Sequence, residues 1–403
     1  MNSDNFLDAF QKLLIPADKW TGEQKSLKEI FEAKLAQYGL TFNQVEKLLS
    51  MQNRSLQGIL DNSAKRVDVV NLLKLGQFLG LNTDMLLKLY INEASVEVIE
   101  ELDDARKKSY IISNFDIKNL YKVGFLKTKT DFDQIEDRIT IYFGLDNIYQ
   151  FSSKSYIPAF SRTKRSANML MKEFWVRSAF MHFEKINNPN EFDRGALVNL
   201  IPKIRPYTMN VKQGLKVVTQ ALYNCGLTVI YQPHLPTTQV RGATFVVNGK
   251  PCMVLTDLNK NYATIWFALM HEIYHVLYDF DEIEKQSFHL TGEPDLFLLE
   301  EDKANQFSRD YLFAKEKSKY ISKYINSPYI VREYAHKNQV HESLVYNFYC
   351  FDSEQEQLGS YWGKFKSQQP DVKIALQELN VNTFDNINID QTIEYLNTNI
   401  FNL

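Results

Sequence analysis

Residues 266–277 read WFALMHEIYHVL and contain the pattern HExxH within an apolar run. Residues four apart lie on one face of a helix, so His271 and His275 can present their imidazoles to a single metal ion. Glu272 is rotated about a third of a turn from His271 and can reach a water molecule on that metal without being a ligand itself. The pattern therefore predicts a buried helix that carries metal-assisted hydrolysis, most often of a peptide bond.

The competing interpretation of this segment is a buried helix with two hydrogen-bonded histidines and a surface glutamate. A chance HExxH is expected in roughly one chain in a hundred of this length, so the pattern alone does not decide between the two. Residues 301–307 (EDKANQF) favour the metal site, because they predict a second helix that can offer a carboxylate.

A catalytic zinc ion takes three protein ligands and keeps one position for water. Glu301 is the expected third ligand, because it begins an amphipathic helix on which the small Ala304 permits close approach to the HExxH helix. Asn305, one turn further on, is expected to hydrogen-bond a ligand. The same three ligands accept Mn²⁺ as well as Zn²⁺. The alternatives for the third ligand are Glu293, Glu300 and Asp302.

The expected role of Glu272 is to take a proton from zinc-bound water and to pass it to the leaving amine. A hydrogen-bond donor is also needed for the oxyanion of the tetrahedral intermediate. His341, at a predicted helix start, is the first candidate for that catalytic role, with an ordinary surface histidine as the competing interpretation. The other candidates are Tyr274, Tyr311 and His336, whereas His182, His234 and His289 show no partner pattern and are expected to be structural.

Length and composition indicate a soluble globular protein of two or three domains, with 403 residues, 44% hydrophobic and 24% charged. A formal net charge of −3 argues against a chain that coats nucleic acid along its whole surface. The cysteines, Cys225, Cys252 and Cys350, are odd in number and widely spaced, so we expect reduced thiols. Neither a signal peptide nor a membrane span is indicated, and we expect a cytoplasmic protein without a membrane partner.

Residues 25–95 predict a domain of five short helices. The first helix, residues 27–38, ends at Gly39, and Thr41 caps the second. A tight break at residues 50–52 separates the second helix from the third. This order of helices is typical of a helix-turn-helix domain of the XRE, or phage-repressor-like, class.

The third of these helices has a polar outer face. Leu56, Ile59 and Leu60 are expected to face inward, and the outward set contains side-chain types that read base edges. The alternative is a helical module that has lost DNA binding and serves protein docking or dimerisation, including a homodimer. Residues 25–93 carry nine basic and seven acidic side chains, which is a weak electrostatic signature for DNA binding. The candidate DNA-binding residues are Gln52, Asn53, Arg54 and Gln57.

The remaining chain is predicted to be α+β and predominantly helical. Short β-rich runs at residues 228–231, 242–247 and 252–256 precede the HExxH helix, and Asn248-Gly249 is a strong hairpin signal. We therefore expect a small antiparallel sheet in this part. The predicted organisation is an N-terminal extension (1–24), the helix-turn-helix domain (25–95), a helical connector (96–213), a metallopeptidase domain (214–350) and a C-terminal helical extension (351–403).

Three segments together resemble the ImmA/IrrE family of metallopeptidases: residues 241–257, residues 266–272 and residues 301–307. The resemblance is to the subgroup with an N-terminal XRE-type helix-turn-helix domain, often encoded beside toxin genes, and covers residues 30–90 and 190–350. It implies a minimal zincin-like fold, a divalent metal on His271, His275 and Glu301, and Glu272 as the base. It also implies regulated cleavage of a helix-turn-helix repressor, in a stress or phage response.

Two departures from the family pattern concern the substrate groove. The family commonly has Gly before the second histidine, where this chain has Tyr274, so a phenol stands beside the metal site. After the third ligand the family tends to run through an apolar stretch to a proline, which residues 307–314 (FSRDYLFA) lack. Neither departure removes a ligand.

Three functions follow from these residues. The first is a metal-dependent endopeptidase that cleaves a helix-turn-helix repressor or a related regulatory protein. The alternative is a DNA-binding transcriptional regulator or antitoxin whose peptidase domain is a sensor or dimerisation module, which an unchanged function in Glu272→Gln would support. A third is a metal-dependent hydrolase of something other than protein, which a screen of small amide substrates would separate.

Overall fold

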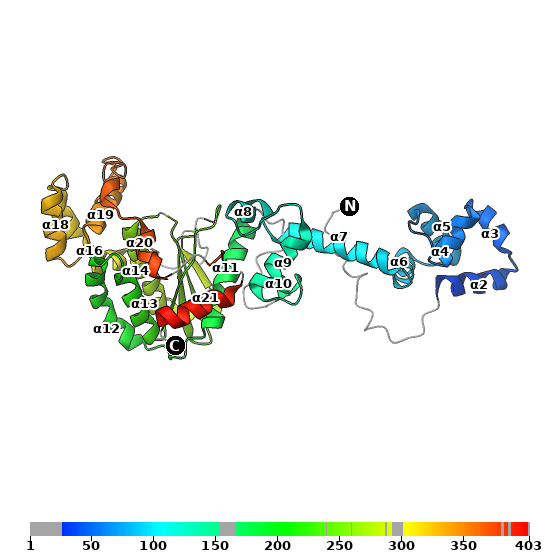
Figure 1. Ribbon diagram of the computed structural model, residues 1–403, viewed down its shortest axis with the longest axis horizontal. Helices are drawn as coiled ribbons and strands as arrows, with labels where there is room; N and C mark the ends of the chain where they lie inside the picture. Colours follow the sequence, from blue (N-terminus) through cyan, green and yellow to red (C-terminus); the bar gives the residue numbers. More distant parts are fainter. Residues whose placement is uncertain are drawn as a thin grey trace. The chain divides into compact units, whose positions relative to one another are not determined.

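The computed structural model describes residues 26–401, except residues 154–166, 239, 259, 287, 292–300, 380–382 and 386–387. The predicted N-terminal extension and the alternative ligands Glu293 and Glu300 therefore lie outside the described residues. The chain forms two compact units that divide after Ser109. In the described part of both units, helices predominate over strands, in agreement with the predicted class (Figure 1).

Before α7, the described residues of the smaller unit form five short helices, at the positions that the sequence predicts. The first begins at Ser26, whose side chain and that of Glu29 form a reciprocal capping box, and ends at Gly39, with φ of 62°. Apolar side chains from all five helices form the core of this unit. The helices are α2 (Leu27–Tyr38), α3 (Phe42–Leu49), α4 (Asn53–Leu60), α5 (Val69–Leu79) and α6 (Thr83–Asn92).

The larger unit consists of helices around one small sheet (Figure 1). Before the sheet come α7 (Val96–Asn114), which begins in the smaller unit, α8 (Ile117–Lys122), α9 (Phe132–Phe143), α10 (Gln150–Ser153), α11 (Ala167–Ile186), α12 (Arg194–Ile204) and α13 (Gly214–Asn224). The later helices are α14 (Tyr262–Tyr278), α15 (Phe280–Gln286), α16 (Glu301–Phe313), α17 (Lys315–Ser322), α18 (Pro328–Lys337), α19 (Glu342–Gln355), α20 (Val372–Leu376) and α21 (Ile389–Leu396). Short 3-10 or π segments lie at Arg205–Met209, Lys366–Gln368, Gln377–Leu379 and Asn397–Phe401.

The sheet has the strand order β1-β3-β2-β4. Its strands are β1 (Thr228–Tyr231), β2 (Gly242–Val247), β3 (Lys250–Leu255) and β4 (Phe288–Thr291). The predicted hairpin joins β2 and β3 through Asn248 and Gly249, whose φ angles of 52° and 75° match the two-residue turn expected there. β4, which the sequence analysis does not predict, pairs antiparallel with β2.

The prediction of an antiparallel sheet is wrong for one pair of strands, because β1 lies parallel to β3 and the sheet is mixed. The β2–β3 hairpin folds back so that β3 lies between β1 and β2. Residues 252–255 of β3 are all fully buried, and β3 takes an interior position with a neighbouring strand on each edge. The pattern of apolar residues along a strand does not indicate which other strand it pairs with.

Helix α14 carries the HExxH pattern and is buried along most of its length. Asn261 caps its start by accepting a hydrogen bond from the N–H of Ala263, and the apolar run that follows packs against β2, β3, α16 and α19. The helix ends at Asp279, whose N–H donates to the carbonyl of His275 at 2.9 Å. None of the described helices is both long and apolar enough to cross a membrane.

One hydrophobic core extends through the larger unit, from Ile111 in α7 to Phe401 near the end of the chain. Side chains from the predicted connector, the predicted metallopeptidase domain and the predicted C-terminal extension all contribute to it. For example, Phe384 contacts the rings of Tyr142 and Phe174. The segments that the sequence analysis separates at residues 213 and 350 therefore share a core. The three cysteines are buried and free.

Candidate metal centre

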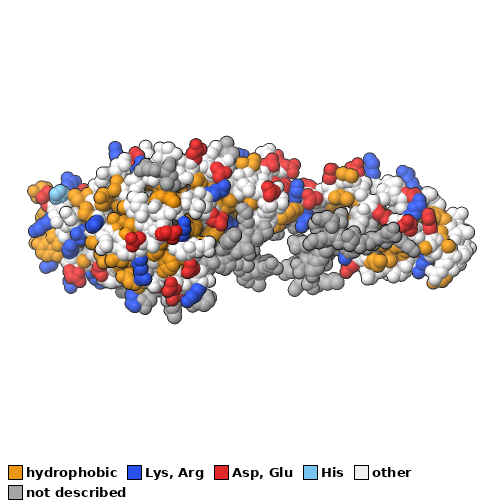
Figure 2. Space-filling view, turned by 90° about the horizontal axis from the view of Figure 1, so that it is seen from below, with side chains coloured by type: hydrophobic (Ala, Val, Ile, Leu, Met, Phe, Trp, Pro, Cys, Tyr) orange, Lys and Arg blue, Asp and Glu red, His pale blue; other side chains and the backbone are white. Residues whose placement is uncertain are grey.

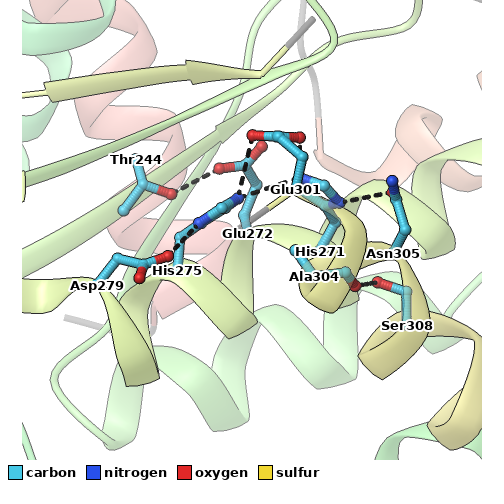
Figure 3. A network of polar contacts seen from close by, with 9 residues as sticks. All are labelled: Thr244, His271, Glu272, His275, Asp279, Glu301, Ala304, Asn305 and Ser308. Atoms are coloured by element: carbon cyan, nitrogen blue, oxygen red, sulfur yellow. Dashed lines mark hydrogen bonds and ion pairs between the residues drawn. The ribbon is translucent and has the colours of Figure 1, made fainter. Parts of the chain in front are cut away.

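Helices α14 and α16 bring two imidazoles and a carboxylate to one point (Figure 3). The Nε2 atom of His271 lies 3.1 Å from Oε2 of Glu301, and Nε2 of His275 lies 3.6 Å from Oε1 of the same carboxylate. The two Nε2 atoms are 3.1 Å apart. Both histidines are buried, whereas the side chain of Glu301 is 39% exposed. The three residues can hold a metal ion that is reached from the side of Glu301.

The separations of these ligand atoms fit a tetrahedral ion. Zinc-to-nitrogen and zinc-to-oxygen bonds near 2.0–2.1 Å at the tetrahedral angle place ligand atoms about 3.3 Å apart. The three separations in the structure, 3.1, 3.1 and 3.6 Å, bracket that value. The side chains therefore need little movement to bind zinc.

The other nitrogen of each imidazole has an oxygen partner. Nδ1 of His271 lies 3.1 Å from Oδ1 of Asn305, and Nδ1 of His275 lies 2.7 Å from Oδ2 of Asp279 (Figure 3). Because each oxygen accepts, each Nδ1 carries the proton and each Nε2 keeps its lone pair. Two such lone pairs at 3.1 Å repel each other, and a shared cation between them removes the repulsion. The tautomers are thus those of metal ligands.

The close contact between α14 and α16 depends on a small residue. Ala304 is fully buried where the two helices meet, one turn after Glu301. Its carbonyl accepts a hydrogen bond from Oγ of Ser308 at 2.8 Å, so the buried hydroxyl finds its partner in the backbone of its own helix. A larger side chain at residue 304 would move the carboxylate of Glu301 away from the histidines.

Glu272 is fully buried beneath strand β2. Its Oε2 accepts a hydrogen bond from Oγ1 of Thr244 at 2.6 Å (Figure 3). Its Oε1 has no hydrogen-bond partner among the described residues. A Cβ atom added at Gly242 would lie 2.3 Å from that oxygen, so only glycine leaves room for the carboxylate. A buried carboxylate oxygen without a donor favours a water molecule or another proton source beside it.

His341, the first candidate for an oxyanion donor, lies near Tyr262, in the first turn of α14 and nine residues before His271. It is the N-cap of α19, where its Nδ1 accepts the N–H of Ser343 at 3.2 Å. Its own N–H donates to Oγ1 of Thr208, and its ring lies 5.4 Å from that of Tyr262. Burial lowers the pKa of this imidazole. The predicted helix start is confirmed, and the side chain of His341 caps that helix, whereas its role as an oxyanion donor stays a prediction.

The tyrosine candidates belong to an aromatic cluster beside His275. The ring of Tyr274 is nearly buried and lies 5.7 Å from the imidazole of His275 and 5.7 Å from the ring of Phe307. Tyr311 packs on Phe307 at 4.7 Å. His336, the remaining candidate, is exposed in the last turn of α18. The phenol of Tyr274 therefore stands where the sequence predicts it, beside the second histidine.

Sequence reasoning missed three residues that contact the centre: Gly242, Thr244 and Asp279. Asp279 had a signal, because it follows His275 by one helical turn and can therefore reach the outer imidazole nitrogen. Thr244 and Gly242 had none, because strand pairing and packing place them over a residue 28 or more positions away.

Two adjoining cavities lie beside the metal centre. The first, of about 180 Å³, is lined by His271 and Glu301 and extends to Val372 in α20. The second, of about 510 Å³, extends to the aromatic side chains of Phe348 and Trp362. Residues of the C-terminal segment thus line both cavities. The walls that the two cavities share are formed by Arg241, Thr264, Phe267 and Asn305.

Two of the histidines expected to be structural, His182 and His234, are not among the grouped metal-ligand side chains of the described residues. His182 in α11 is fully buried, and its Nδ1 lies 2.6 Å from the carbonyl oxygen of Ser178. Burial lowers the pKa of His182 to about 4. Burial also lowers the pKa of His234, despite the nearby carboxylate of Asp257. The side chain of His289 lies outside the described residues.

The polar set on α4 of the smaller unit is exposed, and Leu56, Ile59 and Leu60 beneath it are buried, as the sequence predicts. Asn53 donates a hydrogen bond from its side-chain amide to Glu46 in α3 at 3.2 Å. The amide of this candidate DNA-binding residue therefore already has a partner within the unit. The exposed set is Gln52, Asn53, Arg54 and Gln57.

The chain matches no protein-family model, and it has no significant match among curated proteins or solved structures.

Proposed function

We propose that the protein is a metal-dependent endopeptidase in which His271, His275 and Glu301 hold a divalent ion, Zn²⁺ or Mn²⁺. The observation that carries this proposal is the oriented ligand set. Three ligand atoms lie at separations close to those of a tetrahedral site, and both imidazoles are held in the tautomer that a metal requires.

When bound, the ion supplies a Lewis acid that activates water and polarises the carbonyl of the scissile bond. Glu272 accepts the proton of the attacking water at Oε1 and later delivers it to the leaving amine. Thr244 holds Oε2 of the same carboxylate, so that Oε1 is the oxygen left for this transfer. Asp279 and Asn305 keep the imidazole protons on the outer nitrogens.

The proposed substrate is a helix-turn-helix repressor or a related regulatory protein in the cytoplasm. The resemblance of residues 241–257, 266–272 and 301–307 to the ImmA/IrrE family supports this choice, as do the five short helices of the smaller unit. Such a role belongs to a stress response, to phage defence or to a toxin–antitoxin pair.

The test compares the zinc-loaded full chain with Glu272→Gln, using a panel of purified helix-turn-helix repressors and mass spectrometry of the products. We expect cleavage at one or a few bonds by the wild type and a loss of at least about a hundredfold in Glu272→Gln. Zinc content should be the same in both proteins, because Glu272 is not a ligand. Equal cleavage by the two proteins would contradict the assigned role.

The second candidate function is a DNA-binding regulator or antitoxin whose peptidase domain is a sensor or homodimerisation module. The exposed polar residues on α4 favour it. Figure 2 shows basic and acidic side chains interspersed on the face of the smaller unit in view, so electrostatic attraction to phosphates is modest there. Selection from random duplex DNA tests this function, with Arg54→Ala as the variant expected to weaken binding to any selected site.

A further inference from the structure

The cavity of about 180 Å³ beside the metal centre carries two cationic side chains, Arg241 and Lys260. Both are exposed, and neither forms an ion pair with any described residue. His271 and Glu301 line the same cavity. Two cations that form no ion pair with the described residues therefore lie in the wall of a hollow that opens onto the metal ligands.

The main chain at Arg241 and at Lys260 is held by the elements that shape the metal centre. Arg241 directly precedes Gly242, the residue that packs on Glu272, and its carbonyl accepts a hydrogen bond from Oγ1 of Thr256 at 3.2 Å. Lys260 directly precedes the cap of α14 and has a left-handed φ of 51°. Non-glycine residues adopt that conformation where the surroundings hold them there.

The side chains that line the cavity carry two positive charges, on Arg241 and Lys260, and two negative charges, on Asp257 and Glu301. Oδ1 of Asp257 accepts the N–H of His234 at 2.8 Å, and Glu301 is a proposed metal ligand. The first turn of α14 also contributes Thr264 to the wall, and the N-terminal end of a helix carries a partial positive charge. A bound divalent ion adds two positive charges, so that the cavity with its metal has a net positive charge. The chemistry that complements this wall is a carboxylate.

A carboxylate can come from an acidic side chain or from the C-terminus of a peptide. The second cavity of about 510 Å³ continues from the walls that the first one shares, including Arg241 and Asn305. A polypeptide can therefore extend past the cationic pair, as far as Phe348 and Trp362. This continuity favours a side chain within a longer segment over a chain end.

We infer that the cavity between the metal centre, Arg241 and Lys260 is a subsite for an aspartate or glutamate side chain next to the bond that is cleaved. The inference rests on the proposed peptidase function and specifies its substrate class. Arg241 offers a fork of donors for the two oxygens of the carboxylate, and Lys260 adds a second charge-assisted hydrogen bond.

Direct binding to the zinc-loaded full chain tests this subsite without requiring turnover. The probes are three hydroxamic acids, which chelate zinc, with the same short chain ending in a carboxylate, a carboxamide or an ammonium group. Isothermal titration calorimetry should give a Kd for the carboxylate about tenfold lower than for the carboxamide, since hydrogen bonds to charged groups are the stronger ones. The ammonium probe should bind most weakly.

The variants Arg241→Gln and Lys260→Gln should each remove most of this preference, with zinc content unchanged. Lys212→Gln is the matched control, because Lys212 is exposed and lines neither of these cavities. Two competing peptides separate the sources of the carboxylate: one has an internal Glu and an amidated end, and the other has Gln and a free end. We expect the first to compete more strongly.

Equal affinity for the three probes, or a preference that survives both variants, would overturn the subsite. Stronger competition by the peptide with the free C-terminus would show that the subsite binds the carboxylate of a chain end and not that of an acidic side chain. Failure of every probe to bind the zinc-loaded protein would also contradict the subsite. Cleavage of a repressor without any preference for acidic residues would overturn this inference alone, whereas absence of cleavage would count against the proposed function.

Discussion

Oδ2 of Asp279 lies 2.7 Å from Nδ1 of His275, one helical turn away. Asp279 also ends helix α14, and its N–H donates to the carbonyl of His275. The same residue therefore terminates the helix and orients the ligand. This coupling explains how the second imidazole is held although the chain turns away directly after it.

We expect Asp279→Asn to weaken zinc binding by about ten- to a hundredfold, because the ligand loses the carboxylate that accepts its Nδ1 proton. Competition with a chromophoric chelator measures this affinity. Asp281→Asn is the control, since Asp281 is an exposed residue in α15. If the two variants bound zinc equally well, Asp279 would have no part in orienting His275.

Gly242→Ala should lower peptidase turnover by at least about tenfold with unchanged zinc content. The new methyl group would lie 2.3 Å from Oε1 of Glu272, so the carboxylate must move. Gly363→Ala is the matched control, because a Cβ atom there meets nothing within 4 Å. A Gly242→Ala enzyme with the wild-type rate would show that the position of Oε1 is not critical.

Thr244→Val removes the donor to Oε2 of Glu272 and nearly conserves volume. We expect turnover to fall by about tenfold with little change in KM, because Thr244 positions the base and does not contact substrate. Thr244→Ser keeps the hydroxyl and should retain most of the rate. Comparable losses in the serine and valine variants would indicate that the methyl group, and not the hydrogen bond, matters.

His182 should make the fold sensitive to acid. Its Nδ1 faces the carbonyl of Ser178, its Nε2 has no hydrogen-bond partner among the described residues, and burial lowers its pKa to about 4. Between the unfolded pKa, about 6.5, and this folded value, only the unfolded state binds the proton, so stability falls as the pH falls. At pH 7 both states are neutral and this loss is absent.

Urea unfolding at pH 7 and pH 5, with EDTA present to remove metal, measures this effect. The contribution of His182 at pH 5 is a loss of about 2 kcal/mol in the free energy of unfolding. His182→Gln should show a smaller decrease between the two pH values than the wild type, and His336→Gln, at an exposed position, should not. Equal pH dependence in wild type and His182→Gln would show that His182 titrates normally.

Local signals in the sequence predict the five short helices of the smaller unit, the HExxH helix, the helix of Glu301 and the β2–β3 hairpin. Gly39 ends a helix in the left-handed conformation, and Asn248-Gly249 makes the turn. The parallel pairing of β1 with β3 has no such signal, because it depends on which strand the core covers. Strand β4 was missed for the same reason.

The residues of the metal centre also fall into two groups, those that local signals predict and those that only the tertiary fold brings together. Helical spacing brings His271 and His275 together, and a small residue in the second helix indicates the approach of Glu301. The hydrogen bond from Thr244 crosses from a strand to a helix, so periodicity could not predict it. For His341 the sequence correctly predicts the start of a helix, but such a local signal contains no information about the distance from the metal centre.

The proposed function depends on one divalent ion that is held by His271, His275 and Glu301. Elemental analysis of the purified wild type and of Glu301→Ala, at matched concentration and after reloading with zinc, tests it most directly. Asp302→Ala is the control, because Asp302 is the exposed neighbour on the same helix and no ligand in this account.

We predict one equivalent of zinc or manganese in the wild type and in Asp302→Ala, and its loss in Glu301→Ala. A folded wild type that takes up no metal, or a Glu301→Ala variant that keeps a full equivalent, would contradict the account.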